Sequence, residues 1–193
     1  VVAGSTWPED ERHLVAAVHS LLAKGHAVRL VLVPHEPTPE HVKQAQSRMS
    51  QLGVGWTMIG ELRAGDTRPV VLVDRVGVLG ELYAVADVAW VGGGFGSAGL
   101  HSVLEPAAFG VPVLFGPRHA NAREAGELVA AGGAFEVTSA EAAERVLAGL
   151  LDVYELRARA GAAAREYVHA RLGAAERGAE MVERALEGRA AAA

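Results

Sequence analysis

The chain has 193 residues, half of them hydrophobic, and a formal net charge of −5. This length fits one large domain or two small ones with a substantial core. The acidic balance argues against a general nucleic-acid binder, and the lack of cysteine excludes disulfides, thiolate metal sites and a cysteine nucleophile. No apolar run reaches the roughly 18–20 residues of a membrane span.

The chain opens without Met on "VVAGST", which reads as the end of a strand, so we expect a fragment of a longer protein. Short runs rich in Val, Leu and Ile then alternate with helical patterns. Their lack of polar alternation is typical of parallel strands buried on both faces. We expect strands at 1–3, 28–33, 56–59, 70–73, 88–91, 111–115 and 134–137. We expect helices near 8–24, 39–52, 79–86, 102–109, 121–131 and 139–151.

This alternation predicts an α/β fold with a doubly wound, mainly parallel sheet and helices on both faces, which is Rossmann-like. Four capping-box patterns support the helix starts, at Thr6–Glu9, Ser102–Glu105, Asn121–Glu124 and Thr138–Glu141. The stretch 153–188 is rich in Ala, Arg and Glu, and predicts one or two helices with a break near Gly173. We therefore expect a ligand-binding domain at 1–152 and a helical tail at 153–193. The tail packs on that domain or toward another one.

In a doubly wound sheet, ligands bind beyond the carboxyl ends of the strands. After the first strand, Gly4 permits a turn and Ser5 begins a helix, whose N-terminus suits a phosphate or is a plain cap. After the second, Pro34 and Pro37 stiffen a loop in which His35 is a candidate contact to an anionic ligand. A solvated loop is an equal alternative there.

Two further stretches reach the same edge of the sheet. Backbone amides at the helix start of "GELY" face it, whereas the Leu82 and Tyr83 side chains read as packing residues. The loop "GGGFGSAG" matches neither the dinucleotide nor the nucleotide-triphosphate fingerprint. The residues that follow this loop place His101 and Ser102 at a predicted helix start, with Glu105 one turn later. Glu105 either caps that helix or accepts hydrogen bonds from a ribose diol.

Metal and nucleophile patterns are poor. The eight histidines are scattered without a metal-binding pair, and no nucleophile elbow of the form Gly-x-Ser-x-Gly occurs. We therefore expect no metal site and no nucleophile of this kind within this chain.

Taken in order, "GST", "PHEP", "GELYAVADVAWVGGGFG" and "GLHSVLEPAAFGVPVLFGPRHANAREAGELVAAGGAF" resemble the C-terminal half of 3-deoxy-D-manno-octulosonic acid (Kdo) transferases. These are glycosyltransferases of the GT-B fold. The resemblance reaches about residue 170, and Gly80–Gly133 is its specific part.

The resemblance implies an inverting transfer, without metal or other cofactor, of Kdo from CMP-Kdo to a lipid A precursor in lipopolysaccharide synthesis. The full-length enzyme would work at the cytoplasmic face of the bacterial inner membrane. This half would bind the donor. The other half would carry the membrane anchor, the acceptor surface and the catalytic base, so this fragment alone would be soluble and inactive, without a nucleic-acid partner.

The resemblance also implies roles for individual residues. Ser5 would lie near the donor phosphate, Gly92 and Gly93 would leave room for the donor, and Glu105 would contact the ribose. The whole set of implied donor-binding residues is Ser5, Pro34, His35, Gly80, Glu81, Leu82, Gly92, Gly93, His101, Ser102 and Glu105.

Two departures from the family pattern concern this set. "PHEP" stands where many members have Pro-Arg-His-Pro, so a cation is replaced, and Ser102 stands where many have Asn. Arg118 and Arg123 either restore positive charge or are solvent-exposed. Two alternatives to the Kdo interpretation stay open: a GT-B domain for a UDP-sugar, of N-acetylglucosaminyl transferase or epimerase type, and a non-catalytic α/β interaction module.

Overall fold

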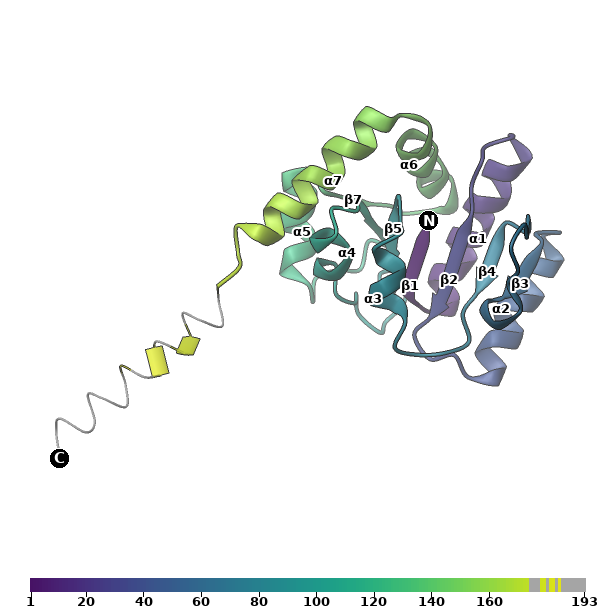
Figure 1. Cartoon of the computed structure of the whole chain (residues 1–193), viewed down its shortest axis with the longest axis horizontal. Helices are drawn as coiled ribbons and strands as arrows, with labels where there is room; N and C mark the ends of the chain where they lie inside the picture. The colour runs from purple at the N-terminus through teal and green to yellow at the C-terminus, as the bar shows by residue number, and fades with distance from the viewer. Residues whose placement is uncertain (174–177, 180, 183, 185–193) are drawn as a thin grey trace.

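The computed structural model describes residues 1–173 together with 178, 179, 181, 182 and 184. Within these residues, seven parallel strands form one sheet in the order β3-β4-β2-β1-β5-β6-β7, with helices on both faces (Figure 1). The strands are β1 (Val2–Thr6), β2 (Leu30–Pro34), β3 (Trp56–Met58), β4 (Val70–Leu72), β5 (Ala89–Val91), β6 (Val113–Phe115) and β7 (Ala134–Glu136). The helices are α1 (Pro8–Ala23), α2 (Pro39–Gln51), η1 (Ile59–Glu61), α3 (Leu79–Tyr83), α4 (Leu104–Ala108), α5 (Arg123–Ala131), α6 (Ala140–Asp152) and α7 (Tyr154–His169). The predicted doubly wound fold is confirmed.

Successive strand residues face opposite sides of the sheet and so enter different apolar clusters. Ala3 and Trp90 pack with α1, α2 and α6 on one face. Val2 and Ala89 pack with Tyr83 of α3 on the other face. On that second face, Val91 and the first and last residues of β6, Val113 and Phe115, pack with α4 and α5. Because both faces are covered, the strands carry apolar residues at nearly every position.

The tail begins as a helix that packs on the α/β layers. Helix α7 contacts α4, α5 and α6, and its Gly161 leaves no room for a side chain, because a Cβ there would lie 2.1 Å from the carbonyl oxygen of Gly110. The helix ends at His169, before the break expected near Gly173, where φ is +83°. Most of the expected helical stretch beyond Gly173 lies outside the described residues.

Three of the four predicted helix starts are wrong by one or two residues. Helix α4 begins at Leu104 without a side-chain cap, so Ser102 and Glu105 form no capping box. Helix α5 begins at Arg123, because the Asn121 amide instead hydrogen-bonds both backbone groups of Leu100. Helix α6 is capped by Ser139 rather than by the residue before it.

The fourth start, α1 at Pro8, is placed correctly, but Trp7 occupies the cap position and Asp10 is the acceptor for its amide. None of the helices in the described part of the chain combines the length and apolar character needed to cross a membrane.

Candidate functional site

The winding direction of the sheet reverses between β1 and β5. From β1 the chain continues to β2 on one side, whereas β5 and the later strands lie on the other. At this point the amide of Gly92 donates to the carbonyl oxygen of Gly4 at 2.9 Å, so the segments leaving the two strands start side by side. Ser5 has a φ of 52°, a left-handed conformation rare for a non-glycine residue. Ligands of doubly wound sheets bind at such reversal points, and backbone strain gathers at functional sites.

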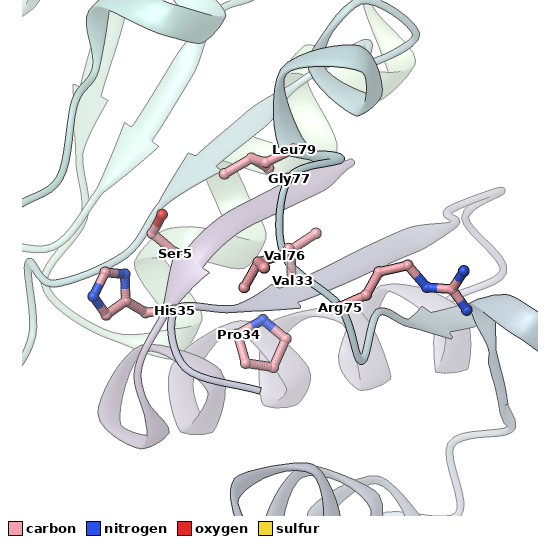
Figure 2. Close-up of a pocket in the computed structure, with 8 residues that line it drawn as sticks. All are labelled: Ser5, Val33, Pro34, His35, Arg75, Val76, Gly77 and Leu79. Carbon is pink, nitrogen blue, oxygen red and sulfur yellow. The ribbon is translucent and has the colours of Figure 1, made fainter. Parts of the chain in front are cut away.

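A cavity of about 160 Å³ opens beside the carboxyl ends of β1, β2 and β4 (Figure 2). It is lined by three predicted residues, Ser5, Pro34 and His35. The rest of its lining is Val33, Arg75, Val76, Gly77 and Leu79. Sequence reasoning placed the stretch after β4 at this edge but selected only residues from Gly80 onward, and so missed the loop residues that line the cavity. The Arg75 guanidinium extends away from Ser5 and His35 in Figure 2, and its Nε lies 3.6 Å from Asp74 Oδ1.

Three aromatic rings from distant parts of the chain meet next to this cavity. The His35 ring lies 4.2 Å from the His101 ring and 5.1 Å from the Trp7 ring, measured between centroids. The Trp7 indole N–H donates to His101 Nε2 at 3.4 Å. Burial of His101, together with the neighbouring charge of His35, lowers the pKa of His101 below its ordinary value. The structure therefore joins two predicted histidines and adds Trp7, which the sequence marked only as part of a helix start.

The glycine loop after β5 is fastened to the first turn of α1 by a buried carboxylate. Asp10 Oδ2 accepts from the amides of Gly93 at 2.8 Å and Trp7 at 3.0 Å, and Oδ1 accepts from the amide of Phe95 at 3.3 Å. Burial raises the pKa of Asp10, while these three backbone hydrogen bonds lower it. Two loop amides that would suit a phosphate thus already bind an anionic side chain. The sequence had no signal that would pair Asp10 with this loop.

The glycines of this loop are also required by the packing of the chain on itself. A Cβ on Gly92 would lie 2.1 Å from the carbonyl oxygen of Ser5, and one on Gly93 would lie 1.9 Å from that of Gly99. Gly93 additionally has a φ of +94°. Both residues are buried, so backbone clearance alone accounts for them. Their predicted contact with the donor stays a prediction.

The remaining predicted residues lie on the short helices α3 and α4, except Ser102, which is exposed two residues before α4 begins. Gly80 and Glu81 are exposed, and a Cβ on Gly80 would meet open space. Leu82 packs against the cluster that contains Tyr83, which confirms the packing interpretation of both side chains. Glu105 is exposed on the second residue of α4, and its negative charge helps burial to raise the pKa of Tyr83. Because Glu105 takes part in no capping box, its carboxylate is available to a ligand.

A second hollow lies between the glycine loop and the loop after β6. Its lining consists of Gly96, Ser97, Gly99, Pro117, Arg118, His119, Ala120 and Asn121. The backbone amide of Arg118 donates to the carbonyl oxygen of Gly94 at 2.8 Å. The Arg118 guanidinium donates to the carbonyl oxygen of Gly96 at 3.4 Å. Arg123, by contrast, lies on α5 and pairs with Glu127 at 2.6 Å. Of the two arginines weighed as replacement cations, only Arg118 touches the glycine loop.

A buried ionisable pair supports the loop that carries His35. Glu11 accepts from the Thr6 hydroxyl at 3.0 Å and contacts His41 Nε2 at 2.9 Å, while His41 Nδ1 lies 3.0 Å from the carbonyl oxygen of Glu36. A carbonyl oxygen only accepts, so Nδ1 carries a proton. The hydrogen bond to Glu11 is the main cause that raises the pKa of His41. The network joins β1, α1, α2 and the loop beside the cavity.

Among the described residues, no group of three histidine or carboxylate side chains is arranged to hold a metal ion. No protein-family model matches the chain. The chain is 33% identical over 188 residues to the 3-deoxy-D-manno-octulosonic acid transferase of Haemophilus influenzae, covering 96% of this chain and 44% of that protein. It is 35% identical over 117 residues to the enzyme of the same name from Aquifex aeolicus, covering 61% and 31% respectively.

Among solved structures, the C-terminal CMP-Kdo binding domain of WaaA from Acinetobacter baumannii superimposes with a TM-score of 0.78 at 22% identity. The match covers 86% of this chain and 87% of that domain. The chain spans less than half the length of the curated relatives it matches. The sequence matches and the shared fold therefore agree that this chain is similar to part of the 3-deoxy-D-manno-octulosonic acid transferases.

Proposed function

We propose that this chain is the donor-binding part of a glycosyltransferase that moves Kdo from CMP-Kdo to a lipid A precursor. The transfer would invert the anomeric centre and use no metal. The observation that carries the proposal is the convergence of Ser5, His35 and His101 at the reversal point between β1 and β5, in a chain with Kdo transferase relatives. The acceptor, the membrane contact and the catalytic base would belong to the remainder of the protein.

The chemistry of the edge suits a nucleotide sugar. Two histidine rings and a serine hydroxyl supply donors for phosphate oxygens, and the ring faces offer stacking surface to a flat base. Glu105 on α4 supplies an acceptor for a ribose diol and has no ion pair among the described residues. The site therefore presents hydrogen-bond donors to the phosphate of the ligand and a hydrogen-bond acceptor to its neutral ribose.

Calorimetry with this chain tests the proposal. CMP and CMP-Kdo should bind, with UMP and UDP much weaker, and CMP at about 100 times its dissociation constant should stabilise the chain by about 2.7 kcal/mol. Preference for UDP would instead support a UDP-sugar domain. The absence of any nucleotide effect would favour an interaction module. Transfer of Kdo by this chain alone would contradict the assignment of the catalytic base to another part of the protein.

The ribose contact has a matched control on the chain. Glu105 and Glu155 are each the second residue of a helix, α4 and α7 respectively, and both are exposed. Each of these helices has a valine at its N-cap position, without a side-chain cap hydrogen bond. Glu105→Gln should weaken CMP binding about tenfold, because it removes a charge-assisted hydrogen bond. Glu155→Gln changes the same helix position and should leave binding unaltered. Equal effects of the two substitutions would remove Glu105 from the site.

A further inference from the structure

The hydrogen bond between Trp7 and His101 determines which nitrogen of the histidine can serve a ligand. An indole N–H only donates, so the His101 Nε2 that it faces must be unprotonated. A neutral imidazole carries its single proton on the other nitrogen, here Nδ1. Within the described part of the chain, Nδ1 makes no hydrogen bond. His101 therefore has one free ring donor, and that donor is Nδ1–H.

The surroundings of His101 hold the ring in this state and orientation. Its backbone amide donates to the carbonyl oxygen of Gly92 at 3.1 Å, which ties the residue to the end of β5. The His35 ring packs on it at 4.2 Å. Trp7 is itself held, because its backbone amide donates to Asp10 at 3.0 Å. A continuous chain of contacts thus runs from Asp10 of α1 through Trp7 to the imidazole.

We propose that Trp7 is a positioning residue that sets the tautomer of His101, so that Nδ1–H is directed to an oxygen of the bound nucleotide. This inference rests on the proposed function for its ligand, but the tautomer itself is a property of the free chain. Without the indole N–H, the ring is free to carry its proton on either nitrogen. Only one of the two forms then presents the donor, and affinity falls.

Nitrogen-15 NMR of the histidine rings at about pH 8, where an unperturbed imidazole is neutral, reads the tautomer directly. The His101 signals are assigned by their loss in His101→Asn. The wild-type chain should show a protonated Nδ1 and an unprotonated Nε2. Trp7→Phe keeps an aromatic ring but removes the N–H, and should convert this pattern to a mixture or to the opposite tautomer. A wild-type ring protonated on Nε2 would overturn the inference whether or not the variant folds.

Binding of CMP is the second readout. Trp7→Phe should weaken it about three- to tenfold, the effect of one lost hydrogen bond. Trp56→Phe is the matched control, because the Trp56 indole also donates at 3.4 Å, to the Ser50 hydroxyl far from the site. It should change neither the His101 spectrum nor the affinity. An unchanged spectrum or unchanged affinity in Trp7→Phe would refute the positioning role. Failure of CMP to bind the wild-type chain would refute the proposed ligand, while the spectrum would still decide the tautomer.

Discussion

Removal of the Asp10 carboxylate should release the glycine loop from α1. Asp10→Ala leaves three backbone amides without their acceptor. Gly93 is buried, whereas Trp7 and Phe95 are half-buried. One orphaned buried amide costs about 1–3 kcal/mol, and the two half-buried ones add less, so the total loss of stability should be about 2–4 kcal/mol.

Asp10→Asn should cost only about 1 kcal/mol, because one amide oxygen still accepts from Gly93 and Trp7 and only the bond to Phe95 is lost. Loss of the charge is partly offset, since burial raises the pKa of Asp10 and so disfavours its charged form in the folded state. Urea unfolding gives both energies, and hydrogen exchange of the Gly93 and Phe95 amides reports on the loop itself.

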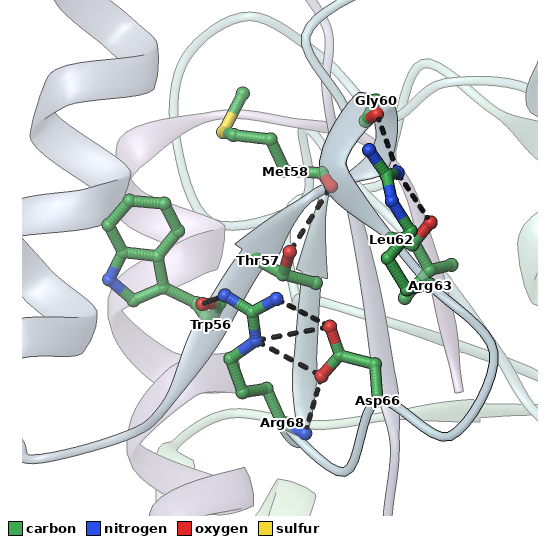
Figure 3. A network of polar contacts seen from close by, with 8 residues as sticks. All are labelled: Trp56, Thr57, Met58, Gly60, Leu62, Arg63, Asp66 and Arg68. Atoms are coloured by element: carbon green, nitrogen blue, oxygen red, sulfur yellow. Dashed lines mark hydrogen bonds and ion pairs between the residues drawn. The ribbon is translucent and has the colours of Figure 1, made fainter.

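Asp66 provides the control for this experiment. It lies at the β3–β4 end of the sheet, where its carboxylate accepts from the backbone amide and guanidinium of Arg68 (Figure 3). Asp66→Asn should leave exchange in the glycine loop unchanged. The assigned role of Asp10 is refuted if the free energy of unfolding of Asp10→Ala lies within about 0.5 kcal/mol of the wild-type value. It is also refuted if the loop amides of the variant exchange at the wild-type rate.

Four other substitutions, one of them a control, test single features of the structure. Gly92→Ala should destabilise by about 1–3 kcal/mol because its Cβ meets the Ser5 backbone, whereas Gly80→Ala, with open space around it, should be neutral or stabilising in urea unfolding. Ser5→Gly should relieve the strain at φ 52° and raise stability by up to about 1 kcal/mol, yet weaken CMP binding in calorimetry; unchanged binding would exclude a contact from the Ser5 hydroxyl. The raised pKa of His41 means that its pair with Glu11 stabilises fully below about pH 6.5 and loses that contribution as pH rises through the folded-state pKa. The free energies of unfolding of the wild type and of His41→Gln should be measured below about pH 6.5 and above the folded-state pKa. Only the wild type should lose this contribution to stability at the higher pH.

The strands and the fold class followed from local pattern. Segments such as 70–73 are apolar throughout because both faces of a parallel sheet are buried, and this demand is written in neighbouring residues. The same logic brought Ser5 and His35 to one edge, since the carboxyl ends of parallel strands meet there. Local pattern placed the helix starts less well. Asn121 looks like a cap although its side chain binds the distant backbone of Leu100, and Ser102 looks like a cap although α4 has no side-chain cap.

The sequence by itself therefore determined the layers of this protein and the edge on which its candidate site lies. Tertiary structure alone decided which groups meet at that edge: Asp10 reaches Gly93 across 83 positions and Trp7 reaches His101 across 94. These partners depend on β1 lying beside β5, and strand order is set by the packing of the whole sheet rather than by any local run of residues. For this reason the glycine loop after β5 holds a carboxylate of its own chain, which no local pattern predicted.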